Sequence, residues 1–212
     1  MSIVIILGTA HTLRTPGKRS PDGTFREALY SREVAREVKA ILEARGHTVF
    51  IDYEPAEPKP EWRSASPTIE RNRELAYRVN YVNALCRKYG AANCIYVSMH
   101  TDAARGSGWQ PARGLSVRVC QGASQSSKDL ARSLYEAGAS RGLAGNRSVP
   151  KEKYWVQNLY VLRNTACPAV LTETLFQNNR EDVHLLLSEE GKQKVIDFHV
   201  EGIINYLNNS RL

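Results

Sequence analysis

Short apolar runs alternate along the chain with longer stretches in which apolar residues recur at helical spacing. The run from Ser2 to Gly8 is continuously apolar and β-branched. Such a run predicts a central strand that is buried on both faces. Apolar runs, and in one case an apolar and polar alternation, predict five more strands, at residues 47–53, 94–100, 114–120, 159–162 and 169–173.

Helical periodicity separates these runs. Between residues 26 and 45, Leu29, Val34 and Val38 are among the apolar residues that recur at helical spacing, and Gly46 follows as a typical C-terminal residue. The same pattern predicts helices at residues 68–89, 130–141, 180–187 and 189–207. Residues 54–67 contain four prolines and are predicted to form a surface excursion without regular structure.

Strands that alternate with helices are typical of α/β proteins. We therefore predict an α/β three-layer sandwich, in which a mostly parallel or mixed twisted sheet of about six strands is flanked by helices. A chain of 212 residues, 42% of them hydrophobic, suits one such domain better than two. We expect residues 1–212 to form a single catalytic domain without a separate binding domain.

The longest purely apolar run, residues 3–7, is much shorter than the roughly 20 residues that span a bilayer. We therefore expect no membrane span. No basic stretch precedes this run to make a secretory signal, which predicts synthesis in the cytoplasm. Removal of a signal peptide from a longer precursor would leave the same sequence.

The net charge of +7 is spread along the chain and favours polyanionic partners in general, without choosing among them. No helix concentrates Arg and Lys with interleaved aromatic residues, so nucleic-acid binding is not expected. The four cysteines are widely spaced and form no C-x-x-C pair. Cys94, Cys120 and Cys167 are predicted to be small buried side chains.

Three predicted strands end in, or shortly before, a side chain suited to metal binding or proton transfer: His11, His100 and Glu173. In open α/β sheets, ligands bind at the carboxyl edge of the strands. Catalytic zinc prefers three protein ligands from His and Asp or Glu, so one carboxylate is still needed. Glu27, at the start of the helix after the His11 loop, is the first candidate and Glu33 the second. An acid at a helix start is also ordinary, because it complements the helix dipole.

Four blocks of sequence also resemble those of a known family, and they occur in its order. The blocks are residues 7–11 (LGTAH), 25–27 (FRE), 97–103 (VSMHTDA) and 170–178 (VLTETLFQN). They resemble the type-3 family of zinc-dependent N-acetylmuramoyl-L-alanine amidases. Arg78 and Asn83 lie on the intervening helix as in that family. The resemblance covers residues 7–178.

The resemblance implies hydrolysis of the amide bond between N-acetylmuramic acid and L-alanine, with peptidoglycan as the partner and Zn²⁺ as the cofactor. His11, Glu27 and His100 would be the zinc ligands, and Glu173 the general base. Arg163, just past a predicted strand, is a candidate for substrate or oxyanion contact, with a plain salt bridge as the alternative. His47, His184 and His199 are expected to be structural, the last two remote from the four blocks. We expect a monomer.

Three positions depart from the family's usual pattern. His11 is followed by Thr12 and Leu13 where a glycine-rich loop is usual, Asp102 stands where Asn is usual, and Leu175 stands where Gly is usual. Two alternative functions are a carboxypeptidase-like zinc peptidase and a catalytically silent wall-binding module. A wall-degrading enzyme without its own secretory signal resembles the phage endolysins, which accumulate in the cytoplasm and reach the wall through a separate pore.

Overall fold

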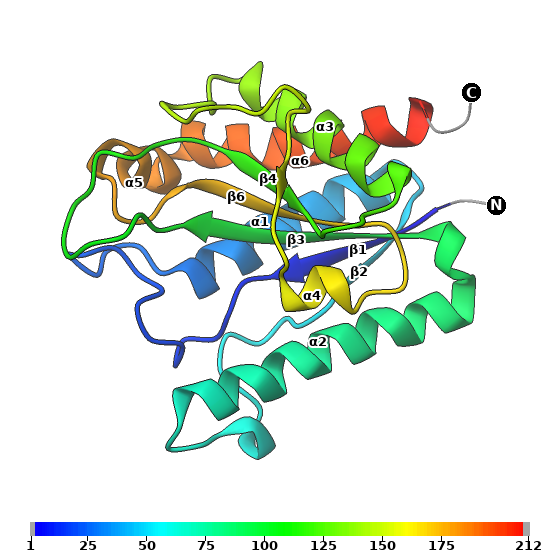
Figure 1. The fold of residues 1–212 in the computed structure, drawn as a ribbon, viewed down its shortest axis with the longest axis horizontal. Coiled ribbons are helices and arrows are strands. Elements are labelled where there is room, and N and C mark those ends of the chain that lie inside the picture. Colours follow the sequence, from blue (N-terminus) through cyan, green and yellow to red (C-terminus); the bar gives the residue numbers. More distant parts are fainter. Residues whose placement is uncertain (1–2, 210–212) are drawn as a thin grey trace.

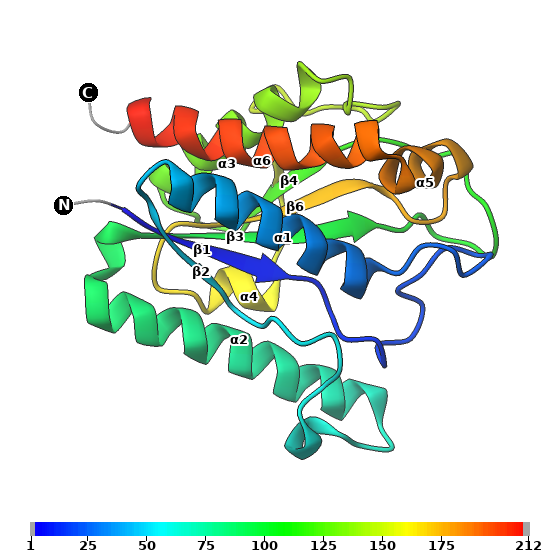
Figure 2. The same ribbon diagram turned by 180° about the vertical axis from the view of Figure 1, so that it is seen from behind.

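The computed structural model describes residues 3–209, in which helices cover both faces of a six-stranded sheet (Figures 1 and 2). The strands are β1 (Val4–Thr9), β2 (Thr48–Ile51), β3 (Cys94–Asp102), β4 (Ser116–Val119), β5 (Trp155–Val156) and β6 (Ala169–Phe176). The order across the sheet is β2-β1-β3-β6-β4-β5. This mixed sheet confirms the predicted α/β sandwich. Ser2, the first residue of the predicted opening strand, lies outside the described residues.

The centre of the sheet is parallel. Strands β2, β1, β3 and β6 run in the same direction, β4 is antiparallel to β6, and β5 runs parallel to β4. Parallel pairing places the carboxyl ends of β1, β3 and β6 at one edge. Thr9 lies opposite Met99, and His100 lies opposite Glu173. The candidate residues at these strand ends are therefore neighbours.

The helices form two layers. They are α1 (Glu27–Ala44), α2 (Pro67–Tyr89), α3 (Gln125–Ala139), α4 (Tyr160–Arg163), α5 (Arg180–Leu187) and α6 (Glu189–Asn209). Helices α1, α3 and α6 lie over one face of the sheet, while α2 and α4 lie over the other (Figures 1 and 2). Alternate β1 residues point into the two cores: Ile5 and Leu7 into the first, Val4 and Ile6 into the second. Within residues 3–209, no helix is long and apolar enough to cross a membrane.

The structure corrects several predicted elements. Residues 159–162 are predicted as a strand, but Leu159 precedes the α4 turn (Tyr160–Arg163), whose Val161 and Leu162 pack in the same core as residues of α2. An apolar run of four residues fits a buried helical turn as well as a strand. The sixth strand is instead β5, within the predicted loop before residue 157.

Other boundaries shift for local reasons. Helix α3 begins at Gln125, five residues before the prediction, because the Ser124 hydroxyl caps it by accepting from the Ser127 amide at 3.2 Å. A short 3₁₀ turn (Pro60–Trp62) lies in the proline-rich excursion, and a second (Ala91–Asn93) precedes β3. Cys94 and Cys167 are buried as predicted, whereas Cys120 is only half-buried.

His199 links α6 to β6, so the prediction that it lies remote from the four blocks is wrong. Its Nδ1 donates to the Val195 carbonyl at 2.8 Å, which leaves Nε2 to accept from the Thr172 hydroxyl at 2.9 Å. Both ring nitrogens therefore have a hydrogen-bond partner. Burial lowers the pKa of His199 to about 4.

Because His199 is buried in its neutral form, we expect the folded state to lose stability in acid. In the unfolded chain, His199 is protonated below its ordinary pKa of 6.5. In the folded chain, it is protonated only below about pH 4. Stability therefore falls as the pH falls through that window, by up to ~3 kcal/mol. In His199→Gln, urea unfolding at about pH 7 and about pH 4.5 should show a smaller loss. The exposed His184→Gln is the control, and an unchanged loss in His199→Gln would contradict the assignment.

Candidate functional site

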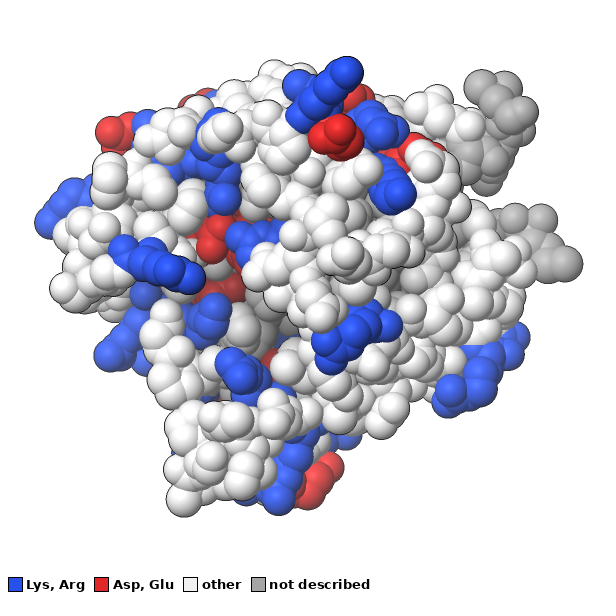
Figure 3. Space-filling view, in the orientation of Figure 1, with Lys and Arg blue, Asp and Glu red and all other residues white. Residues whose placement is uncertain are grey.

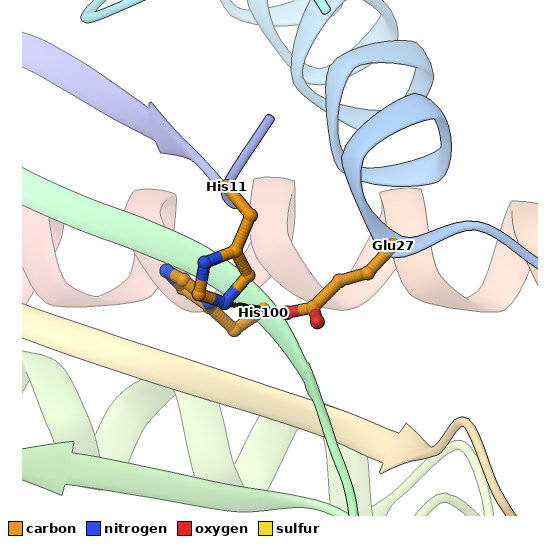
Figure 4. A group of neighbouring side chains, drawn as sticks. All are labelled: His11, Glu27 and His100. Atoms are coloured by element: carbon orange, nitrogen blue, oxygen red, sulfur yellow. Dashed lines mark hydrogen bonds and ion pairs between the residues drawn. The ribbon is translucent and has the colours of Figure 1, made fainter. Parts of the chain in front are cut away.

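Three side chains from separate parts of the chain meet at the carboxyl edge of the sheet. His11 lies two residues beyond β1, His100 lies within β3, and Glu27 is the first residue of α1. Figure 4 shows the three side chains converging on one point. One ligand atom from each lies within 4.8 Å of the others. Among the described residues, no other group of three His, Cys, Asp or Glu side chains is gathered in this way.

Glu27 is the centre of this group. Its Oε1 lies 3.1 Å from His100 Nδ1 and 3.7 Å from His11 Nε2, and it accepts a hydrogen bond from the Thr101 amide at 3.1 Å. The two imidazole rings meet edge to face, with centroids 5.0 Å apart. The second carboxylate oxygen, Oε2, is buried without a hydrogen-bond partner, and its nearest cation is Lys18 Nζ at 3.7 Å. A buried carboxylate oxygen in this state fits a site that binds a cation.

The protonation states also suit a metal. Burial lowers the pKa of His11 well below its ordinary value, which keeps the imidazole neutral. Burial alone would raise the pKa of Glu27, but the adjoining His11, His100 and Lys18 hold it well below its ordinary value. Neutral imidazoles and an ionised carboxylate are the forms that bind metals. Two nitrogens and one oxygen are a donor set that catalytic zinc prefers. Glu33, the alternative ligand, is exposed and pairs with Lys192 at 2.8 Å.

The backbone of His11 is held in an unusual shape. Its φ of 45° lies in the left-handed region, which is costly for a non-glycine residue. Arg32 donates to the carbonyls of Ala10 and His11, both at 2.8 Å, and Arg78 donates to the His11 carbonyl at 3.3 Å. Two buried guanidinium groups thus hold the loop that lacks the usual glycines.

Arg78 is itself fixed by two buried carboxylates. It pairs with Asp52 at 2.6 Å and with Glu74 at 2.9 Å. Burial would lower the pKa of Arg78, yet the two carboxylates raise it above its ordinary value. Asp52 also accepts from the Thr9 amide at 3.0 Å and from the Tyr96 hydroxyl at 2.9 Å. Asp52, which directly follows the apolar strand β2, was missed as a site-supporting residue, although an acid at that strand end was the available signal.

Asn83, which the resemblance also places on this helix, lies farther along α2 and makes a structural contact. Its side chain donates to the Asn164 carbonyl at 2.9 Å and accepts from the Ala166 amide at 2.9 Å. It therefore joins α2 to the turn between α4 and β6.

Glu173 lies on β6 directly opposite His100, with 13% of its side chain exposed. Burial and the charge of Asp102 raise its pKa to about 7, against the opposing effects of His100 and Arg118. Two residues later, Leu175 has a φ of 64°, beside an irregularity in the pairing of β3 and β6. The chain keeps a glycine-type conformation there although it carries leucine.

A cleft of about 350 Å³ joins these groups. His11, His100 and Glu173 line it, and Leu75, Leu159 and Tyr160 form an apolar wall. Figure 3 shows acidic atoms at the floor of a hollow whose border is basic. Arg118 and Gln157 also line the cleft. Neither was predicted as a site residue, because Arg118 was only one of the polar positions of the alternating strand predicted at residues 114–120 and Gln157 only the end of a predicted loop.

Arg163 does not take the place expected for it. It lies at the end of α4 and not after a strand, donates to Asn158 Oδ1 at 3.2 Å, and lies over the Tyr160 ring. Among the described residues it lines a different hollow, between the α3 start and the turn before β6. Neither the predicted oxyanion contact nor the alternative salt bridge has support in this arrangement.

Comparison with known proteins decides the family. The family model of the N-acetylmuramoyl-L-alanine amidases, Amidase_3, matches residues 3–205. The chain belongs to this amidase family. The family predicted from the four sequence blocks is therefore confirmed.

One sequence relative and two solved structures show how similar this amidase-family chain is to individual proteins. The endolysin of Bacillus phage SPP1 is 34% identical over 124 residues, which are 58% of this chain and 44% of that protein. The matched part thus spans less than half of that relative. The CwlD amidase of Clostridioides difficile, solved in complex with the GerS lipoprotein, has a TM-score of 0.77 at 20% identity, covering 98% of this chain and all of that one. The Ami1 amidase of Mycobacterium smegmatis has a TM-score of 0.76 at 18% identity, covering 98% and 97%.

The buried Asp52–Arg78 pair should be essential for stability. Asp52→Asn leaves the Arg78 guanidinium buried with only one anionic partner, which should lower the free energy of unfolding by about 3–5 kcal/mol. Urea denaturation followed by circular dichroism measures it. Glu43→Gln, in the exposed Lys39–Glu43 pair of α1, is the control and should cost less than ~1 kcal/mol. Similar costs for both variants would show that the buried pair stabilises the fold no more than an exposed pair does.

Proposed function

We propose that this chain is a zinc-dependent N-acetylmuramoyl-L-alanine amidase, which hydrolyses the amide bond between N-acetylmuramic acid and the L-alanine of peptidoglycan. The observation that carries the proposal is the meeting of His11, His100 and the buried Glu27, with its unpartnered oxygen, at a cleft that also contains Glu173. Membership of the amidase family supports the bond and the substrate.

His11, Glu27 and His100 would hold the zinc ion. When bound, zinc supplies Lewis-acid chemistry, because it polarises an amide carbonyl and makes water more acidic. Glu27 contributes a carboxylate that needs no deprotonation before it binds the ion, since its pKa is already low. The clamp from Arg32 and Arg78 holds the His11 backbone, so the imidazole is placed before the ion arrives.

Glu173 would act first as general base and then as general acid. It takes a proton from the attacking water as the oxygen–carbon bond forms at the amide carbonyl. It then gives that proton to the L-alanine nitrogen as the carbon–nitrogen bond breaks. Its exposure to the cleft and its pKa of about 7 support both steps, because a carboxyl group with that pKa exchanges protons readily near neutral pH.

We further propose that residues 1–212 act as one catalytic domain and as a monomer, with peptidoglycan as the binding partner. The similarity to a phage endolysin supports synthesis in the cytoplasm followed by phage-type release to the wall. The single sheet with its two helical layers supports the one-domain assignment.

Metal binding tests the ligand set. Isothermal titration of the metal-free protein with zinc should show one ion per chain. His11→Ala, Glu27→Gln and His100→Ala should each weaken the affinity by roughly 100-fold or more, since each removes a direct ligand. Glu33→Gln is the matched control on the same helix and should bind as the unsubstituted protein does. An unchanged affinity in Glu27→Gln would reject the ligand set.

Catalysis tests Glu173. Glu173→Gln keeps the shape of the side chain but loses the proton acceptor, so kcat should fall about 10²–10⁴-fold while zinc affinity is retained. The exposed Glu189→Gln is the control. Mass spectrometry of digested wall should show intact stem peptides with a free L-alanine amine. Trimming of C-terminal residues would instead indicate a peptidase, and full activity in Glu173→Gln would overturn its catalytic role.

A further inference from the structure

Four charged side chains meet beside the candidate metal ligands His11, Glu27 and His100. We call them the Asp102 cluster: Asp102, Arg118, Arg147 and Glu173. Asp102 Oδ2 accepts from Arg118 at 2.6 Å and from Arg147 at 2.5 Å. Arg118 Nη1 lies 3.4 Å from Glu173 Oε1. The side chains are each 13–16% exposed, so these contacts are only partly screened by water.

Arg118 is the centre of the cluster. One of its terminal nitrogens points to Asp102, while the other is shared between Gln157 and Glu173. A planar guanidinium held at both ends has little freedom to turn. Its position therefore limits where the Glu173 carboxylate can lie in the cleft.

Asp102 is held by the backbone and by Arg147. Its Oδ1 accepts from the Ala103 amide at 2.8 Å. Arg147, its second partner, donates to the Gly114 carbonyl at 3.1 Å and lies 4.2 Å from the centre of the Phe176 ring. Asp102 thus connects a guanidinium fixed to the backbone with one that faces the cleft.

The cluster contains two carboxyl groups and two guanidinium groups. If Asp102 lost its charge, Glu173 would be the one remaining anion for both cations, and Arg118 already lies 3.4 Å from it. A carboxylate and a guanidinium this close readily form a two-point pair. Such a pair would draw Glu173 toward Arg118 and out of its place in the cleft.

We propose that Asp102 is a positioning residue, which holds Arg118 so that Arg118 orients the Glu173 carboxylate without capturing it in a full ion pair. Arg147 fixes Asp102 in turn. The inference rests on the proposed function of Glu173. It assigns a role to Asp102, Arg118 and Arg147, which are neither candidate metal ligands nor the proposed general base.

A double-variant cycle tests this chain of contacts. Asp102→Asn should lower kcat about 10–100-fold, the scale expected when a reacting group is misplaced by about 1 Å. KM should change less than about twofold, because substrate binding is not removed. Arg118→Gln should also lower kcat. The decisive expectation is that Asp102→Asn has no further effect when Arg118 is already Gln, since Asp102 acts through Arg118.

Zinc affinity and the urea midpoint provide the structural readouts. Both should stay near those of the unsubstituted protein in every variant, and Asp129→Asn, in the exposed Asp129–Arg132 pair of α3, is the control. Additive losses in the cycle would overturn the proposal. A raised KM with unchanged kcat in Arg118→Gln would also overturn it, by making Arg118 a substrate contact; this test stands even if Asp102→Asn fails to fold. Inactivity of the unsubstituted protein on wall substrate would instead reject the proposed function.

Discussion

The burial of the Glu27 carboxylate is the constraint on which the rest of the site depends. A carboxylate removed from water is costly unless its oxygens find partners. Here one oxygen is satisfied by the Thr101 amide and His100, while the other has no hydrogen bond and only Lys18 as a nearby cation, at 3.7 Å. The fold must therefore bring two histidines and a helix start to one point. The parallel pairing of β1 with β3 does this, because it places His11 and His100 at the same edge.

Strained backbone near the site is offset by buried charges and packing. His11 and Leu175 both have left-handed φ angles, one among the candidate metal ligands and the other beyond Glu173. Arg32 and Arg78 stabilise the His11 loop by hydrogen bonds to its carbonyls. Leu175 is 2% exposed and packs in the core, which offsets the cost of its conformation. At both positions, tertiary contacts offset the cost of a conformation that favours glycine.

Two ionic networks flank the cleft and differ in character. The Asp52–Arg78–Glu74 network is fully buried and supports the His11 loop through the hydrogen bond from Arg78 to the His11 carbonyl. The Asp102 cluster is partly open to the cleft and includes the general-base candidate Glu173. Burial makes the first network a matter of stability, because a lost partner leaves a charge without water. Partial exposure lets the second network orient a reacting group at a smaller cost to the fold.

By itself, the sequence determined the layer architecture and the amidase family of this protein. Continuous β-branched runs and helical spacing are local signals, and they placed His11, His100 and Glu173 at strand ends before any contact was known. Glu27 needed the motif as well, because an acid at a helix start is common. Only the tertiary structure rejected Glu33, turned residues 160–163 into a helix and moved Arg163 away from the cleft. It also brought in Asp52, Arg118 and Arg147, whose contacts with Arg78, Asp102 and Glu173 join residues 16 to 55 positions apart in the chain. Single charged residues carry no periodic signal, so their roles arise only when folding brings distant segments together.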